Sequence, residues 1–151
     1  MWLTNTPHMQ TLDFSIHINA PRARVWESLW SNAGYRYWTA VFAEGSYYEG
    51  DLSEGSRVRF LGPNNSGMWS LVGAHRAPER LAFVHQGAIK DGVEQEPGVW
   101  AGTTESYDLR DVDGATELSV TVGTTEEAAG YFNETFPKAL QRVKEAVEGR
   151  L

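Results

Sequence analysis

The segment from Thr124 to Glu148 constrains the fold more than any other, because its pattern is that of a long amphipathic helix. Thr124 and Glu127 have the T-x-x-E spacing of a capping box, which marks a helix start. Apolar residues then recur at steps of three and four, which places them on one side of a helix. These residues are Ala128, Phe132, Phe136, Ala139, Leu140, Val143, Ala146 and Val147.

This helix cannot be stable alone. Fixing the backbone of one residue costs about 1–2 kcal/mol, whereas a fully buried apolar side chain returns about 1.5–3 kcal/mol at most. The apolar side must therefore lie on another element. Pro137, in the middle of the segment, removes one backbone hydrogen bond and favours a bend. A bent helix over a curved sheet would leave a hollow between them.

The segments before the helix are typical of strands separated by turns, with two short helices after the first strand. A short helix is expected from Pro21 to about Ser31, and a second over Tyr35–Trp38. A long polar loop is expected over 88–98, and Asp113-Gly114 is typical of a hairpin turn. The seven expected strands are residues 12–18, 41–48, 57–60, 68–75, 81–87, 100–110 and 117–122.

A meander of strands joined by short turns, followed by one long helix, predicts an α+β fold. The 151 residues fit one domain, and we expect a polar tail over 1–10 and a single domain over 11–151. An antiparallel sheet of this kind hides one face and needs the helix to cover it.

Charge and composition exclude several classes of function. The net charge of −7 opposes binding to nucleic acid and to anionic membranes. The chain has no cysteine, which excludes disulfides and thiolate chemistry and is compatible with the cytoplasm. Neither a metal-binding pattern of histidines, nor a nucleophile elbow, nor a phosphate-binding glycine motif is present, so we expect no metal and no cofactor.

Several motifs together resemble the START-like (SRPBCC) superfamily, which includes the birch-pollen allergens and the polyketide cyclases. More narrowly, they resemble its bacterial branch named after the heat-shock-protein ATPase activator. The matching motifs are Ile16-x-Ile18-Asn19-Ala20-Pro21-x-x-x-Val25-Trp26, Tyr37-Trp38, Phe42, Gly45-Ser46, Gly55-Ser56-x-Val58-x-Phe60 and Phe136-Pro137-x-Ala139-Leu140-x-x-Val143-Lys144.

The resemblance covers nearly the whole chain, from about Leu12 to Glu148. It implies a helix-grip fold, in which two short helices follow the first strand and the long C-terminal helix covers the concave face of a curved, seven-stranded antiparallel sheet. Because the superfamily includes lipid carriers, cyclases, hydrolases and chaperone partners, the resemblance specifies the fold better than the function.

Glu105 is the strongest candidate for chemistry. In the strand around it, Thr103 and Tyr107 share its parity, which puts the Glu105 carboxylate on the apolar face. A buried carboxylate must find a partner or take up a proton. His85, in the neighbouring strand, is in step with Phe83 and is expected to face the same hollow. The two residues could anchor a guest or form an acid–base pair. A purely structural ion pair, or a bulge that turns Glu105 outward, is the alternative.

Aromatic side chains are expected to form much of the wall of the hollow, although rings at such spacing also suit a plain core. The predicted ligand-binding residues are Tyr35, Trp38, Phe60, Trp69, Phe83, His85, Trp100, Thr103, Glu105, Tyr107, Phe132 and Phe136.

Three functions stay open. The first is binding of a small hydrophobic or aromatic molecule in a cavity of roughly 300–1,000 Å³. The second is a cyclase- or hydrolase-type enzyme with Glu105 and His85 as acid and base. The third is a module that binds a chaperone partner through an exposed patch, for instance around Ile89 to Gly98. A homodimer through a strand edge or the outer side of the helix is compatible with each.

Overall fold

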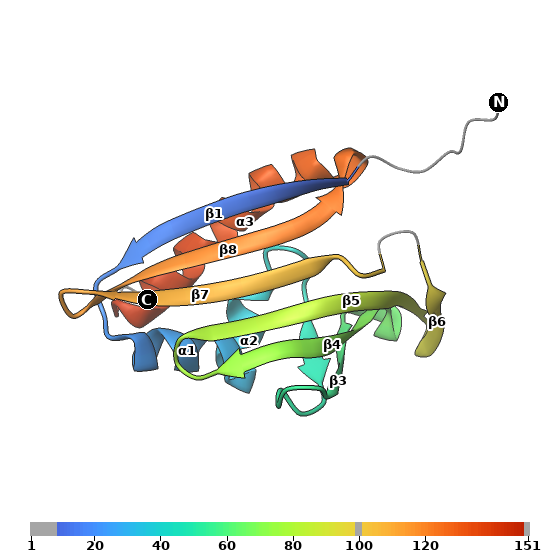
Figure 1. Ribbon diagram of the computed structural model, residues 1–151, viewed down its shortest axis with the longest axis horizontal. Coiled ribbons are helices and arrows are strands. Elements are labelled where there is room, and N and C mark those ends of the chain that lie inside the picture. The colour runs from blue at the N-terminus through green and yellow to red at the C-terminus, as the bar shows by residue number, and fades with distance from the viewer. Residues whose placement is uncertain (1–8, 99–100, 150–151) are drawn as a thin grey trace.

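The computed structural model describes residues 9–98 and 101–149, and Figure 1 shows a curved antiparallel sheet with a long helix across it. The strands are β1 (Met9–Ile18), β2 (Tyr47–Glu49), β3 (Arg57–Leu61), β4 (Gly67–Arg76), β5 (Arg80–Lys90), β6 (Val93–Pro97), β7 (Thr104–Val112) and β8 (Ala115–Thr125). The helices are α1 (Arg22–Trp30), α2 (Asn32–Thr39), the short 3-10 turn Pro63–Asn65 and α3 (Glu126–Val147).

The sheet order is β1-β8-β7-β5-β4-β3-β2, with β6 paired to β5 alone. All described pairs are antiparallel, so the meander predicted from the turns is confirmed, and the predicted α+β fold with it. Within the described residues, no helix has the length and apolar character that a membrane span requires.

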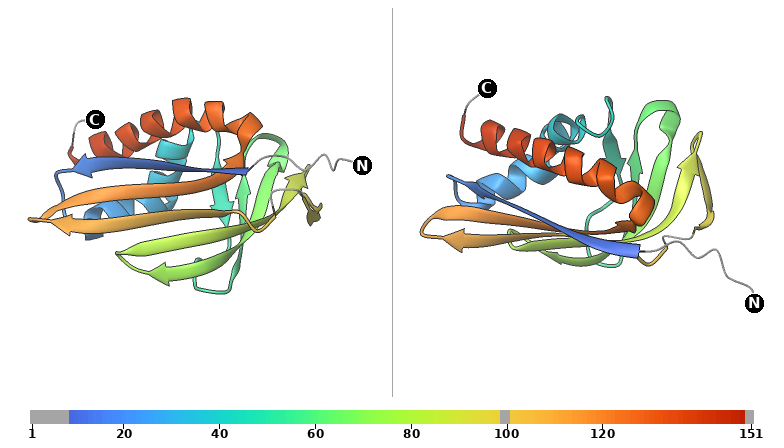
Figure 2. Two further views of the ribbon diagram at one scale, coloured as in Figure 1. Left: turned by 45° about the horizontal axis from the view of Figure 1, so that its top comes forward. Right: turned by 90° about the horizontal axis from the view of Figure 1, so that it is seen from above.

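The helix α3 covers only part of the sheet. It packs mainly against β1, α1 and α2, and less against β8. The rings of Phe14 on β1 and Phe136 on α3 stack with centroids 5.1 Å apart. Leu140 and Val143 are fully buried under the helix. In Figure 2 the helix runs along the β1 side of the sheet, while β4 and β5 curve away beyond its N-terminal end.

The start of α3 differs by one residue from the predicted capping box. Thr125, not Thr124, is the N-cap, and its hydroxyl accepts a hydrogen bond from the Ala128 amide at 3.2 Å. The reason is that β8 continues one residue further, with Thr125 opposite Met9. Glu126 and Glu127 then lie in the first turn, where their charges suit the helix dipole.

The predicted strand over 41–48 is wrong except at its end. Only Tyr47–Glu49 is extended, because α2 runs into turns in which the amides of Phe42 and Ala43 both bond the Thr39 carbonyl. These turns carry Phe42 toward the interior.

The predicted loop over 88–98 is also wrong, and it accounts for the eighth strand. β5 extends to Lys90 and β6 returns from Val93, joined by Asp91 (φ 50°) and Gly92 (φ 83°). Both central residues have the left-handed conformation that a tight hairpin turn needs. The same Asp-Gly signal was recognised at Asp113-Gly114, where the predicted hairpin is confirmed.

Replacing Leu140 tests whether α3 is held by packing on the sheet. Leu140 is 1% exposed, so Leu140→Ala should lower the free energy of unfolding by about 2–5 kcal/mol in chemical denaturation. Lys138, whose side chain is 65% exposed on the same helix, is the matched control. Lys138→Ala should change stability by about 0.5 kcal/mol or less. Equal losses in the two variants would contradict this packing.

Candidate functional site

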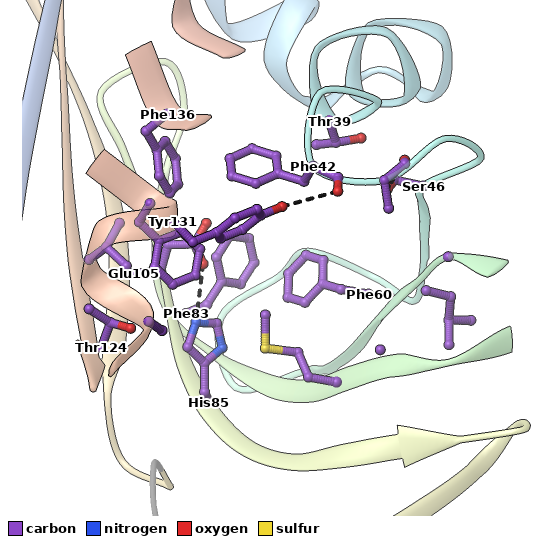
Figure 3. Close-up of a pocket in the computed structure, with 18 of the residues that line it drawn as sticks. Thr39, Phe42, Ser46, Phe60, Phe83, His85, Glu105, Thr124, Tyr131 and Phe136 are labelled. Carbon is purple, nitrogen blue, oxygen red and sulfur yellow. Dashed lines mark hydrogen bonds and ion pairs between the residues drawn. The ribbon is translucent and has the colours of Figure 1, made fainter. Parts of the chain in front are cut away.

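A cavity of about 480 Å³ lies where α3 leaves the sheet uncovered. Its walls come from the end of α1, from α2 and the turns after it, from β3, the 3-10 turn, β4, β5 and β7, from the end of β8, and from the first half of α3. Figure 3 shows side chains from these elements converging on the space. The volume lies in the range predicted for a ligand cavity.

Ten of the twelve predicted ligand-binding residues line this cavity. They are Tyr35, Trp38, Phe60, Phe83, His85, Thr103, Glu105, Tyr107, Phe132 and Phe136. Trp100 lies outside the described residues. Trp69 is not among the lining residues, so its assignment to the cavity wall was wrong.

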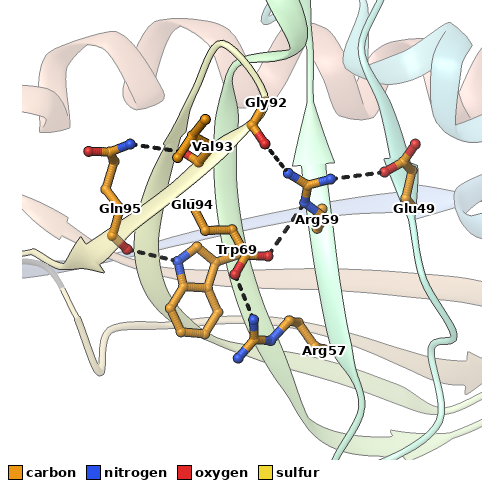
Figure 4. Close-up of polar contacts among 8 residues, drawn as sticks. All are labelled: Glu49, Arg57, Arg59, Trp69, Gly92, Val93, Glu94 and Gln95. Atoms are coloured by element: carbon orange, nitrogen blue, oxygen red, sulfur yellow. Dashed lines mark hydrogen bonds and ion pairs between the residues drawn. The ribbon is translucent and has the colours of Figure 1, made fainter.

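Trp69 belongs to the opposite face of the sheet. Its neighbours in β4 decide this, since Met68 lines the cavity and Ser70 is fully buried on the same side. The indole Nε1 donates to the Gln95 carbonyl at 3.2 Å, and the Arg57 guanidinium lies 4.3 Å from the ring centroid (Figure 4). The ring thus fastens the β5–β6 hairpin to the outside of the sheet.

Two arginines of β3 strengthen the same attachment. The Glu94 carboxylate accepts from Arg57 Nη1 at 2.6 Å and lies 3.5 Å from Arg59 Nε. Arg59 also donates to the Gly92 carbonyl at 2.8 Å (Figure 4). The segment Val93–Pro97, which is predicted as part of a polar loop, is therefore held against this face of the sheet as β6.

A chain of polar groups crosses the floor of the cavity. The His85 Nδ1 atom lies 2.7 Å from the Ser70 hydroxyl, and His85 Nε2 lies 3.1 Å from Glu105 Oε1. The Tyr107 hydroxyl donates to the other oxygen, Glu105 Oε2. The sheet sets this order: His85 of β5 is opposite Ser70 of β4, and Glu105 of β7 is opposite Phe83 of β5.

This arrangement confirms the parity argument for Glu105 and His85. Both side chains face the cavity (Figure 3), and Glu105 is in direct contact with His85. The alternative in which a bulge turns Glu105 outward is wrong, because the β7 register is regular from Glu105 to Asp108 against both of its neighbours.

The partners of Glu105 decide its charge. Burial raises the pKa of the carboxyl, but three effects outweigh it: the hydrogen bond with His85, attraction to the charge of His85, and the hydrogen bond from Tyr107. The pKa of Glu105 is therefore held below its ordinary value of about 4.5, and the group is a carboxylate near neutral pH.

The tyrosines nearby stay protonated. Burial, followed by the charge of Glu105, raises the pKa of both Tyr107 and Tyr35 above the ordinary value of 10. The negative charge of Glu105 therefore also acts on the hydroxyl of Tyr35, which belongs to α2.

Several lining residues had not been predicted. Trp30 meets the Tyr107 ring edge-on at 5.0 Å. Tyr131 is 49% exposed, and its hydroxyl donates to the Phe42 carbonyl at 3.0 Å, which ties α3 to the turn after α2 (Figure 3). Phe42 was not predicted to line the cavity because a strand, and not a turn, was expected over 41–48. Tyr131 was missed because it flanks the apolar stripe of α3, and no local pattern separates such a residue from solvent-facing ones.

The described residues contain no group of three or more His, Asp or Glu side chains placed to hold a metal ion. The chemistry that this site supports is hydrogen bonding, charge attraction and proton exchange by His85 and Glu105 beside an aromatic wall.

Comparison with known proteins establishes the fold. No protein-family model matches the sequence, and no curated protein is recognisably similar. The solved Aha1 dimer from Colwellia psychrerythraea is 20% identical, with 93% of this chain and 98% of that chain covered and a TM-score of 0.70. Protein MLL2253 from Mesorhizobium loti is 13% identical, with 92% and 97% covered and a TM-score of 0.71. CalU16 from Micromonospora echinospora is 16% identical, with 95% and 77% covered and a TM-score of 0.68. The helix-grip fold predicted from the sequence, with a curved antiparallel sheet and a long C-terminal helix, is confirmed.

Glu105→Gln should change how stability depends on pH. The folded-state pKa of Glu105 lies below its unfolded value, so its contribution is present above about pH 4.5 and is lost as the pH falls through the folded-state pKa. At neutral pH we expect the variant to be less stable by about 1–3 kcal/mol, and the difference should shrink on acidification. Urea denaturation from pH 7 to pH 3 measures both.

Glu134→Gln is the control, because the Glu134 side chain is 75% exposed. Its stability curve should follow that of the unchanged chain. A Glu105→Gln difference that is constant across the pH range would contradict an ionised Glu105.

Proposed function

We propose that this chain binds a small hydrophobic or aromatic molecule in the cavity between the sheet and α3. The observation that supports this proposal is a cavity of about 480 Å³ that has aromatic walls and a single series of hydrogen-bonded polar groups at its floor. Native interiors pack closely and leave few voids larger than a water molecule, so a plain core does not explain this space. Ligand sites in proteins have this size and this mixture of apolar wall and few polar groups.

The rings favour an aromatic guest. Phe60 and Phe83 meet edge-to-face with centroids 4.9 Å apart, and Tyr131 stands at 62° to Phe132 at 5.4 Å. Rings fixed at steep angles to one another present both faces and edges to the space they enclose. A flat aromatic guest can then stack on some rings and meet others at their edges.

A second candidate is acid–base catalysis by Glu105 and His85. It is favoured by the 3.1 Å contact between them and by the access of both to the cavity. Ser70 completes a serine–histidine–carboxylate series, but its side chain is fully buried and is not among the lining residues. A guest could not reach the Ser70 hydroxyl, so this candidate is limited to proton transfer without a covalent intermediate.

A bound guest recovered from cells can distinguish ligand binding from catalysis. If the site only binds, a molecule found by native mass spectrometry should keep its mass during incubation with the purified chain. Turnover that stops in Glu105→Gln, while the molecule still binds, would favour catalysis instead.

The homodimer and the chaperone partner stay predictions. A solved protein with this fold is described as a dimer, but at 20% identity this supports no more than testing the chain by light scattering. The positions to replace if a dimer forms are the exposed large apolar side chains of the described residues: Met9 on β1, Leu71 on β4, Val93 on β6 and Tyr131 on α3.

Filling the cavity should weaken binding. Ala128 lies in the first turn of α3, is half-buried and lines the cavity. N-phenyl-1-naphthylamine, an uncharged aromatic dye that fluoresces in apolar sites, should give saturable fluorescence with the unchanged chain. Ala128→Phe should weaken its affinity at least about fivefold, since extra bulk in a fitted space costs on the order of 1–3 kcal/mol.

Asn133→Phe adds the same ring to an exposed position of α3 and is the control. Its dye affinity should match that of the unchanged chain. Unsaturable fluorescence, or equal affinity for Ala128→Phe, would contradict binding in this cavity.

A further inference from the structure

The charged side chains at the cavity are few. Among the described residues that line it, Glu105 is the only acidic side chain and His85 the only basic one. Neither lysine nor arginine is among them. An anionic guest would therefore depend on His85 alone for a cationic partner, and both ring nitrogens of His85 already have partners in Ser70 and Glu105.

Glu105, in contrast, can accept further donors. Each carboxylate oxygen has two acceptor positions, and the described bonds use one on Oε1, toward His85, and one on Oε2, from Tyr107. The Glu105 side chain keeps 19% of its surface accessible, on a residue that lines the cavity. A guest that brings an N–H or O–H group to the floor can thus add a hydrogen bond to a buried carboxylate, which is among the stronger kinds.

The aromatic wall also favours a cationic guest over an anionic one. Ring faces carry negative charge density and attract cations, most strongly where water is excluded. Phe42, Phe60 and Phe132 line the cavity and are only partly buried, so part of each ring is open to a guest. The net charge of −7 on the chain adds a long-range attraction for cations.

We propose that the cavity selects its guest by charge, taking aromatic molecules with a protonated amine or a hydroxyl group directed at Glu105 and rejecting aromatic or fatty carboxylates. This inference rests on the proposed function and names the class of ligand for the same cavity. An entering carboxylate loses its hydration and meets the Glu105 carboxylate, whereas an ammonium group finds in Glu105 a charged acceptor that is already fixed in place.

Four ligands that share one ring system test the inference. They are 2-naphthylmethylamine, 2-naphthylmethanol, 2-methylnaphthalene and 2-naphthoic acid, measured by displacement of N-phenyl-1-naphthylamine at neutral pH. We expect affinity to fall in that order, with the amine at least about tenfold tighter than the acid, as a hydrogen bond to a buried charge would give. The alcohol should exceed the methyl compound, which isolates the hydrogen-bond donor without any change to the protein.

Glu105→Gln assigns the selection to one side chain. It keeps the shape of the group and removes its charge, so the affinities of the amine and the acid should come within about threefold of each other. Glu134→Gln removes an exposed charge from α3 and should leave the tenfold difference in place.

The outcomes separate this inference from the function on which it rests. If 2-naphthoic acid binds as tightly as the amine, or if the preference survives in Glu105→Gln, the charge selection is wrong while binding in the cavity stands. If none of the four ligands displaces the dye, and the dye itself does not bind, the proposed function fails and the inference falls with it.

Discussion

The packing of α3 on one half of the sheet is the constraint from which the site follows. Phe136 stacks on Phe14, and Leu140 and Val143 are buried beneath the helix, so α3 is fixed over the β1 side. The strands β4 and β5 belong to the same continuous sheet but curve away from it (Figure 2). A single helix on a twisted sheet cannot cover both halves, and the uncovered half becomes the cavity.

A carboxylate in this space is stable only because the strands supply its partners. His85 and Tyr107 together outweigh the cost of burying the charge of Glu105, and Ser70 bonds the far nitrogen of His85. The same bonds orient the carboxylate toward the cavity. Stability and ligand choice therefore depend on one group of side chains, and a substitution that changes one is expected to change the other.

The sequence predicted most of the fold and the centre of the site, because both depend on strong periodic patterns. The parity of β7 was enough to place Glu105 and Tyr107 on one face, since the strand is regular. Trp69 could not be placed in the same way, because Met68, Trp69, Leu71 and Val72 are all apolar and the strand shows no clear alternation of apolar and polar residues. The placement of Phe42 depends on where α2 ends, and tertiary contacts decide that position. The Asp91-Gly92 turn was present in the sequence as a hairpin signal, but the polar residues around it favoured a loop.

The aromatic residues explain why the cavity does not collapse. Trp30 meets Phe83, Tyr107 and Trp38 at steep angles, between 68° and 87°. Each ring in such a cluster is braced by the edge or face of another, and rotation into the open space would break several contacts at once. The wall is therefore formed before a guest arrives, so little side-chain freedom remains to be lost on binding. A rigid wall also fixes the distance between a bound ring and Glu105, which is what allows a single carboxylate to discriminate between an amine and an acid carried on the same ring.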